Sequence, residues 1–244
     1  MSALFALRPA SLADRVEGLD WPAVSRELDA EGWAVIPSLL TATDCGEIVR
    51  LYDRHEAFRS QVIMARHGFG QGEYKYLAYP LPDRIQDLRA SLYRRLVPVA
   101  NRWRMLLDSA VRFPPDHASF LERCHAARQT RPTPLLLKYG PGDYNRLHQD
   151  LYGEHVFPIQ VAILLSEPGR EFTGGEFVIA EQRPRMQTRV EVAPLAQGDA
   201  LAFAVHHRPA AGSRGPYRVH LRHGVSRVRS GARYTLGVIF HDAV

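Results

Sequence analysis

The spacing of hydrophobic residues differs between the two halves of the chain. In the first half, apolar residues at Trp21, Val24 and Leu28 recur as they do on one face of a helix. Thr41 or Thr43 is an expected N-cap for the next helix. The helices predicted here cover about 21–30, 44–57, 83–108 and 116–128, with a short strand over 33–36.

Residues 65–82 interrupt this helical pattern. Glycines and prolines stand on both sides of a run of alternating aromatic residues. Because successive side chains of a strand point to opposite faces, Tyr74 and Tyr76 share one face and Lys75 takes the other. We expect this segment to form a lid.

From Pro134 onward, short β-rich runs are separated by Gly, Pro or Asp. Strands and helices do not alternate there, which favours a sandwich or barrel over a parallel doubly wound sheet. The prediction is an α+β chain with a helical region over 1–133 and a β core over 134–244, packed as one compact unit. The predicted strands are Leu135–Tyr139, Val156–Leu165, Gly175–Ala180, Arg189–Val192, Asp199–Val205 and Tyr234–Phe240.

Composition limits the class of protein. A chain of 244 residues with 45% hydrophobic content suffices for one large domain. It contains no run of 18 apolar residues, so we expect no membrane span. The apolar run within MSALFALRPASLADR is too short for a secretory signal. Cys45 and Cys124 are far apart and lack metal-ligand spacing, so we expect a reduced, cytoplasmic setting.

The basic residues are almost all arginine. The net charge is +5, and Lys75 and Lys138 are the only lysines among 31 basic residues. Arginine binds phosphate and carboxylate in a fork geometry that lysine cannot match, so a nucleic-acid partner is one interpretation. Genome base composition is the other.

Candidate metal ligands stand two residues apart in the segment that ends Leu-His148-Gln-Asp150. On an extended chain, residues i and i+2 face the same side, so both side chains can reach one ion. Two histidines and one carboxylate hold non-haem Fe(II) and leave positions open for other ligands. An isolated His-x-Asp occurs often by chance, so a third ligand has to be found.

Several later histidines are candidates for that third ligand. His155 is too close along the chain, and no strand follows His241 to carry a further anchor. His206 and His207 follow an apolar strand, and their roles stay open. The full set is His155, His206, His207, His220, His223 and His241.

His223 is the best placed of these histidines. A tight turn at Ser230-Gly231 predicts that the chain returns beside it as an antiparallel strand. The resulting hairpin would bring Arg233, ten residues after His223, beside the metal.

This arrangement resembles the Fe(II)/2-oxoglutarate-dependent dioxygenase superfamily, whose core is a double-stranded β-helix of the jelly-roll, cupin-like kind. Its pattern is His-x-Asp, a distal His and a basic residue about ten positions on, matched here by His148, Asp150, His223 and Arg233. The resemblance covers about 134–244. It implies a catalytic Fe(II) held by the first three residues, with 2-oxoglutarate and O₂ as co-substrates and ascorbate as an aid in vitro.

The resemblance also assigns roles around the oxoacid. Arg233 would bind the distal carboxylate of 2-oxoglutarate bidentately, and the Thr235 hydroxyl on the same face would add a second bond. Tyr139 stands where prolyl-hydroxylase-like members place a tyrosine near the oxoacid. A core aromatic residue is the other interpretation of Tyr139.

The implied reaction is hydroxylation of a C–H bond, coupled to decarboxylation of 2-oxoglutarate to succinate. The tract over 203–243 resembles a bacterial oxygenase family linked to DNA repair by oxidative demethylation of damaged DNA, so alkylated DNA is one expected substrate. The well-known alkylation-repair enzymes carry an arginine where this chain has Ile239 and an acidic residue where it has Leu151. A protein side-chain hydroxylase is therefore the alternative, and a metal-binding or sensing module without turnover is a third interpretation.

Candidate substrate contacts follow from these interpretations, while the oligomeric state stays open. Aromatic residues of the lid would stack on a flipped base, and polar residues would line the mouth of the site. These candidates are Tyr74, Lys75, Tyr76, Tyr144, Asn145 and Arg218.

Overall fold

Two antiparallel sheets face each other in the computed structural model, which describes residues 11–244. The larger sheet contains, in spatial order, β1 (Trp33–Ile36), β11 (Ala200–Ala204), β7 (Ile159–Leu164), β15 (Arg233–Val238), β5 (Leu135–Tyr139), β4 (Glu73–Leu77) and β2 (Phe58–Ile63). The apolar N-terminal stretch at 1–10 lies outside the described residues.

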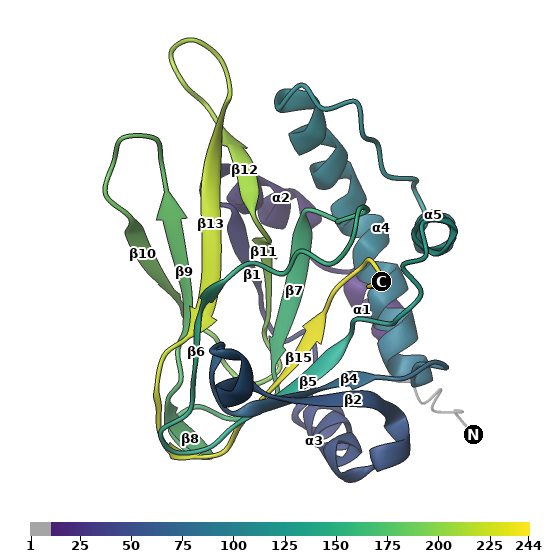
Figure 1. Cartoon of the computed structure of the whole chain (residues 1–244), viewed down its shortest axis with the longest axis vertical. Helices are drawn as coiled ribbons and strands as arrows, with labels where there is room; N and C mark the ends of the chain where they lie inside the picture. The colour runs from purple at the N-terminus through teal and green to yellow at the C-terminus, as the bar shows by residue number, and fades with distance from the viewer. Residues whose placement is uncertain (1–10) are drawn as a thin grey trace, which may run out of the picture.

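The smaller sheet lies opposite the larger one (Figure 1). Its order is β10 (Arg189–Ala193), β9 (Phe177–Gln182), β13 (Tyr217–Val225), β6 (Tyr144–His148) and β3 (Gly70–Gln71), with β12 (His207–Ala210) paired to β13. A separate pair joins β14 (Val228–Gly231) to β8 (Phe172–Gly174). The predicted α+β jelly roll is confirmed.

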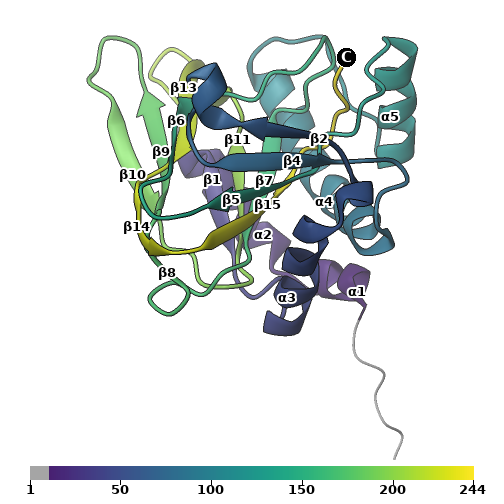
Figure 2. The same ribbon diagram turned by 60° about the horizontal axis from the view of Figure 1, so that its bottom comes forward.

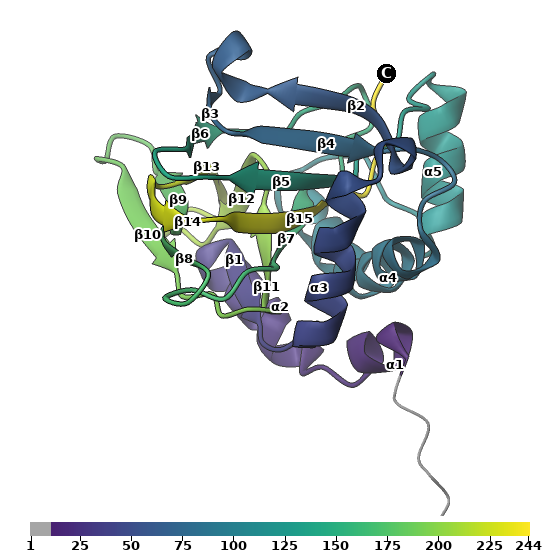
Figure 3. The same cartoon turned by 90° about the horizontal axis from the view of Figure 1, so that it is seen from below.

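The helices lie mainly on the side of the larger sheet that faces away from the smaller one (Figures 1 and 3). They are α1 (Leu12–Glu17), α2 (Trp21–Glu31), α3 (Ala42–Arg50), α4 (Asp83–Leu106) and α5 (His117–Ala126). Because this sheet is covered on both faces, every residue of β7 and β11 is buried. Within 11–244, no helix combines the length and apolarity that a bilayer span requires.

The helix predicted over 44–57 is shorter than expected. Thr41 and Asp44 form a capping box at the start of α3, which ends at Arg50. Two 3-10 turns (Leu51–Asp53 and His55–Ala57) then carry the chain into β2. This change of geometry lets β2 pair with β4 at the edge of the larger sheet.

Residues before 134 contribute three strands to the larger sheet. At one edge β1 pairs with β11, with Trp33 opposite Phe203. At the other, β4 pairs with β5, with Tyr74 opposite Leu137, and β2 follows (Figure 2). The N-terminal region is therefore continuous with the sheet that the C-terminal region builds.

The hairpin predicted from His223 to Arg233 is wrong. β13 belongs to the smaller sheet, whereas β15 pairs with β5 and β7 in the larger one. The almost fully buried β15 needs a neighbour on each side, and a hairpin with β13 cannot supply both. Gly231 makes the crossing at a φ of +76°, where a Cβ would lie 1.9 Å from the Glu171 carbonyl oxygen.

A buried ion pair ties α4 to the end of the chain. Arg89 Nη2 donates to Asp242 Oδ1 at 2.8 Å, and both side chains are fully buried. The second carboxylate oxygen accepts from the Tyr79 hydroxyl at 2.9 Å and contacts His125 Nε2 at 2.8 Å. Burial opposes ionisation of Asp242, but Arg89 and these partners still hold its pKa below the ordinary value.

Candidate metal centre and its pocket

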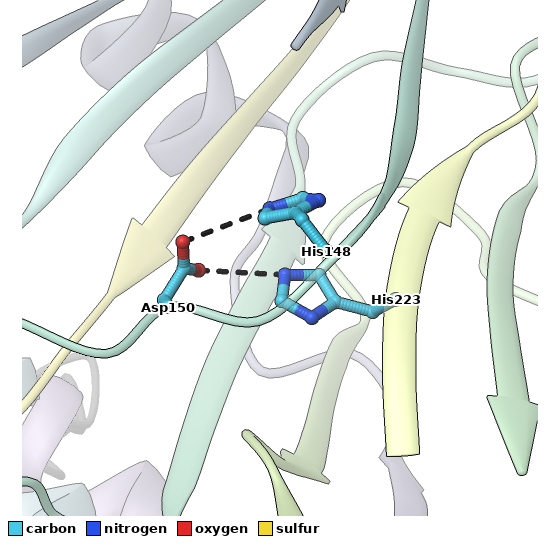
Figure 4. Close-up of side chains that lie close together, drawn as sticks. All are labelled: His148, Asp150 and His223. Carbon is cyan, nitrogen blue, oxygen red and sulfur yellow. Dashed lines mark ion pairs between the residues drawn. The ribbon is translucent and has the colours of Figure 1, made fainter. Parts of the chain in front are cut away.

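His148, Asp150 and His223 converge on one point between the two sheets (Figure 4). His148 ends β6 and is the register partner of His223 in β13, while Asp150 follows β6 in the next loop. The Asp150 oxygens lie 3.6 Å from His148 Nε2 and 3.4 Å from His223 Nε2. Among residues 11–244, no other His, Cys, Asp or Glu group of three comes as close.

Neighbouring groups hold both imidazole rings in place. His148 Nδ1 lies 2.7 Å from the Arg146 carbonyl oxygen, which leaves Nε2 directed at the site. The His223 ring is stacked on Phe177, with 5° between the planes, and its centroid lies 4.6 Å from that of Phe203. The rings therefore present fixed nitrogen donors.

The electrostatics of the three residues favour a divalent cation. Burial opposes ionisation of Asp150, yet hydrogen bonding and charge from His223 and His148 hold its pKa well below the ordinary value. Burial, followed by the effect of His148, lowers the pKa of His223. One carboxylate with two imidazoles is the donor set that suits Fe(II) and leaves three coordination positions free.

A chain of hydroxyl groups reaches Asp150 from β4 of the larger sheet. The Tyr152 hydroxyl donates to Asp150 Oδ1 at 2.7 Å, and the Tyr76 hydroxyl donates to the Tyr152 oxygen at 3.2 Å. A hydroxyl has one proton, so the bond to Asp150 commits Tyr152 to accept from Tyr76. Burial and the charge of Asp150 raise the pKa of Tyr152, which keeps this donor protonated.

A cavity of about 370 Å³ opens beside the three residues. Phe69 and Leu147, both substantially exposed, line one part of it, and the buried residues Tyr139, Arg233 and Thr235 line another. The cavity wall is mostly apolar with a few polar groups, as in sites for small organic ligands.

Arg233 is a buried cation whose hydrogen-bonding capacity is only partly used. Its side chain is 1% exposed, Nη1 donates to Thr235 Oγ1 at 2.6 Å, and Nε has no partner. Tyr139, its register partner in β5, has a buried hydroxyl that also lacks a partner. Burial lowers the pKa of Arg233 to about 10. Unpaired donors around a buried cation fit the distal carboxylate of an oxoacid.

The structure separates the residues predicted to form the lid. Tyr74 lines the cavity, and Tyr76 joins the hydroxyl chain. Lys75 is 6% exposed and points to the other face of β4, where Nζ donates to the Tyr52 carbonyl oxygen at 2.9 Å. Its placement as a substrate contact is therefore wrong, because strand alternation turns it away from the cavity.

The remaining predicted contacts also differ in position. Asn145 lines the cavity, whereas the neighbouring Tyr144 does not. Arg218 is an exposed residue of β13 outside the cavity lining, and its contact with a substrate stays a prediction. His206 and His207 lie near it, their Nδ1 atoms 3.0 Å apart, and do not line the cavity either.

Tyr152, Gln160 and Phe69 are among the cavity residues that the sequence interpretation missed. Tyr152 stands two positions after Asp150, so the i, i+2 rule that linked the metal ligands could have indicated it. Gln160 is the only polar residue in the apolar β7, and its buried Oε1 has no partner. Phe69 stands between two glycines, and this pattern indicates a turn or a close approach of the backbone to another segment.

Sequence comparison connects the chain to an oxygenase family. The family Oxygenase-NA, described as "Oxygenase, catalysing oxidative methylation of damaged DNA", matches residues 72–243. The chain is also 49% identical over 164 residues to the uncharacterized protein Rv2227 of Mycobacterium tuberculosis strain H37Rv. The aligned stretch covers 67% of this chain and 70% of the relative. The uncharacterized protein MT2286 of strain CDC 1551 matches to the same extent.

Solved structures share the fold at low sequence identity. A prolyl hydroxylase from Trichoplax adhaerens, in complex with a hypoxia inducible factor peptide fragment, has a TM-score of 0.57 at 14% identity, covering 91% of this chain and 89% of that one. A Pseudomonas putida prolyl-4-hydroxylase has a TM-score of 0.55 at 14% identity, covering 89% and 96%. The epimerase SnoN of nogalamycin biosynthesis, described as non-heme and alpha ketoglutarate dependent, has a TM-score of 0.51 at 14% identity, covering 89% and 80%.

Proposed function

We propose that the chain, which belongs to the Oxygenase-NA family, is a 2-oxoglutarate- and Fe(II)-dependent dioxygenase that hydroxylates N-methyl groups of alkylated nucleic acid. The observation that carries the proposed chemistry is one cavity with a two-histidine, one-carboxylate site and an unpaired buried arginine. The balanced reaction consumes O₂, 2-oxoglutarate and the N-methylated substrate, and forms succinate, CO₂ and the hydroxylated substrate. A hydroxylated N-methyl group then breaks down to formaldehyde and the N–H base.

The polar residues at the metal site and around Arg233 have proposed tasks. His148, Asp150 and His223 hold Fe(II), which when bound supplies the oxygen activation. Arg233 and Thr235 bind the distal carboxylate of 2-oxoglutarate through charge-assisted hydrogen bonds.

Several apolar and aromatic groups support this arrangement. Phe177 and Phe203 pack on the His223 ring, which keeps it oriented and excludes water from that side. The Tyr139 hydroxyl is a further donor beside the oxoacid. Because Tyr74 and Tyr76 also reach the site, we propose that residues 1–133 and 134–244 work as one unit.

Formaldehyde release from a single-stranded oligonucleotide with N-methylated bases tests the substrate. The assay contains Fe(II), 2-oxoglutarate, O₂ and ascorbate, and succinate is measured in parallel. We expect formaldehyde and succinate from the wild type and neither from His148→Ala or Asp150→Ala. His55→Ala is the matched control, because His55 is exposed in a 3-10 turn and does not line the cavity.

Other outcomes would favour the alternative functions. Succinate without formaldehyde, together with a 16 Da mass gain on a peptide, would indicate a protein side-chain hydroxylase. The absence of succinate under every condition, with intact metal binding, would indicate a binding module without turnover. Succinate formation by His148→Ala at the wild-type rate would remove that residue from the metal site.

A further inference from the structure

Large apolar side chains stay exposed at one edge of the metal cavity. Phe69 and Leu147 line the cavity and are 47% and 44% exposed, and Leu151 directly follows a proposed metal ligand and is 47% exposed. Burial is the usual state of such side chains, and apolar residues grouped beside a pocket mark a surface that a partner covers. We call Phe69 and Leu147, which both line the cavity, the apolar rim.

The exposure of Phe69 does not come from a loosely held loop. Its backbone N–H donates to the Met64 carbonyl at 3.2 Å, and its carbonyl accepts from the Arg146 N–H at 2.9 Å. The next residue, Gly70, has a φ of +141°, and a Cβ there would lie 2.2 Å from the Tyr144 carbonyl oxygen. The fold therefore fixes the main chain of Phe69 while leaving the ring open to solvent.

The surroundings of Phe69 point to an aromatic and anionic partner. The His67 ring is stacked against the Phe69 ring, with centroids 5.3 Å apart and 24° between the planes. Arg146 lines the same cavity, is exposed, and forms no ion pair within the described residues. Asp150 is the only carboxylate in the cavity lining and is a proposed metal ligand, so nothing at the rim neutralises this arginine. An aromatic ring beside a free cation is the combination that binds single-stranded nucleic acid.

We propose that Phe69, backed by His67, is a stacking platform for an unpaired nucleobase, and that Arg146 contacts a phosphate of the same strand. The proposal rests on the proposed function and adds a mode of recognition. The rim holds a single strand by one stacked base while a neighbouring base enters the metal cavity. Because every base has an aromatic face, this contact tolerates any sequence.

Binding without turnover tests the platform directly. Fluorescence anisotropy of a labelled single-stranded oligonucleotide is measured on protein loaded with Mn(II) and 2-oxoglutarate. Phe69→Ala is expected to weaken binding about tenfold or more (about 1.4 kcal/mol), whereas Phe69→Tyr keeps the ring and the affinity. Met105→Ala is the matched control, because Met105 is 57% exposed on α4 and does not line the cavity.

The phosphate contact has a separate readout in the salt dependence of binding. Arg146→Gln is expected to reduce the slope of log K against log salt by about 0.7, the value for one phosphate contact to a single strand. An unchanged slope would overturn the assignment of Arg146. Mn(II)-induced thermal stabilisation verifies that each variant retains a folded site.

Three outcomes would overturn the platform, and they are distinguishable from failure of the proposed function. Equal affinity of Phe69→Ala and wild type, with formaldehyde still released, would remove Phe69 but keep the substrate class. Full affinity of Phe69→Leu would show an apolar contact without stacking. Peptide binding that depends on Phe69, with no oligonucleotide binding or formaldehyde release, would overturn both proposals in favour of a protein substrate.

Discussion

Replacing Arg233 by methionine should have opposite effects on stability and on co-substrate binding. Burial lowers the pKa of Arg233 from 12.5 to about 10, which corresponds to about 3 kcal/mol spent on keeping the charge inside the fold. Because the folded pKa lies below the unfolded one, this penalty is complete at neutral pH. It disappears only as the pH rises from about 10 to the unfolded value.

The substitution also removes the hydrogen bond to Thr235, which stabilises the fold by about 1 kcal/mol. We therefore expect Arg233→Met to raise the free energy of unfolding of the ligand-free protein by about 2 kcal/mol. The wild type should gain about 2.7 kcal/mol when 2-oxoglutarate is present at 100 times its dissociation constant. The variant should gain almost nothing at the same concentration, because the carboxylate has lost its cation.

Urea unfolding with Mn(II), with and without 2-oxoglutarate, measures both effects in one experiment. Arg208→Met is the matched control: Arg208 is also 1% exposed, but it pairs with Glu181 at 2.7 Å. Removing Arg208 should destabilise the protein, since the buried Glu181 loses its one buried partner and keeps only the more exposed Arg183 and Arg189. An Arg233→Met variant that is less stable than the wild type without ligand, or equally stabilised by 2-oxoglutarate, would contradict the proposed role of Arg233.

Three further substitutions test other parts of the structure. Tyr152→Phe should keep the fold but weaken Mn(II) binding and slow succinate formation, because Asp150 loses its hydroxyl donor; unchanged metal affinity would contradict this role. Asp242→Asn should lower the free energy of unfolding by about 3–5 kcal/mol in urea titrations, since Arg89 would be left buried without an opposite charge; a loss below about 1 kcal/mol would contradict it. Gly70→Ala should lower the melting temperature, because a Cβ cannot fit against the backbone of β6, and an unchanged value would be inconsistent with the β3–β6 pairing.

Local patterns were sufficient to locate most elements of the fold. The strand over 33–36 and the long helix from residue 83 appear nearly where their periodicity predicted them. Alternation also put Tyr74 and Tyr76 on one face and Lys75 on the other. It could not say which face meets the cavity, because that depends on how β4 is placed against the rest of the molecule.

The pairing of strands could not be derived from these patterns. Ser230-Gly231 looked like the tip of a hairpin, yet these residues end β14, which pairs with β8, and the chain then enters β15 of the larger sheet. A turn fixes only the local direction of the chain, whereas the partner of β15 is decided by which neighbours bury both its edges and faces. The proposed anchor Arg233 consequently reaches the cavity from the sheet opposite His223.

The sequence by itself determined the chemical groups and their short-range geometry: a His and an Asp two positions apart, a later His, and an arginine ten residues on. Only the tertiary structure decided that Arg233 is buried without a carboxylate, that Tyr152 and Tyr76 support Asp150, and that Phe69 stays exposed. Side-chain spacing follows from backbone geometry within a few residues. Burial and hydrogen-bond partners depend instead on residues distant in the chain, which only the packing of the two sheets brings together.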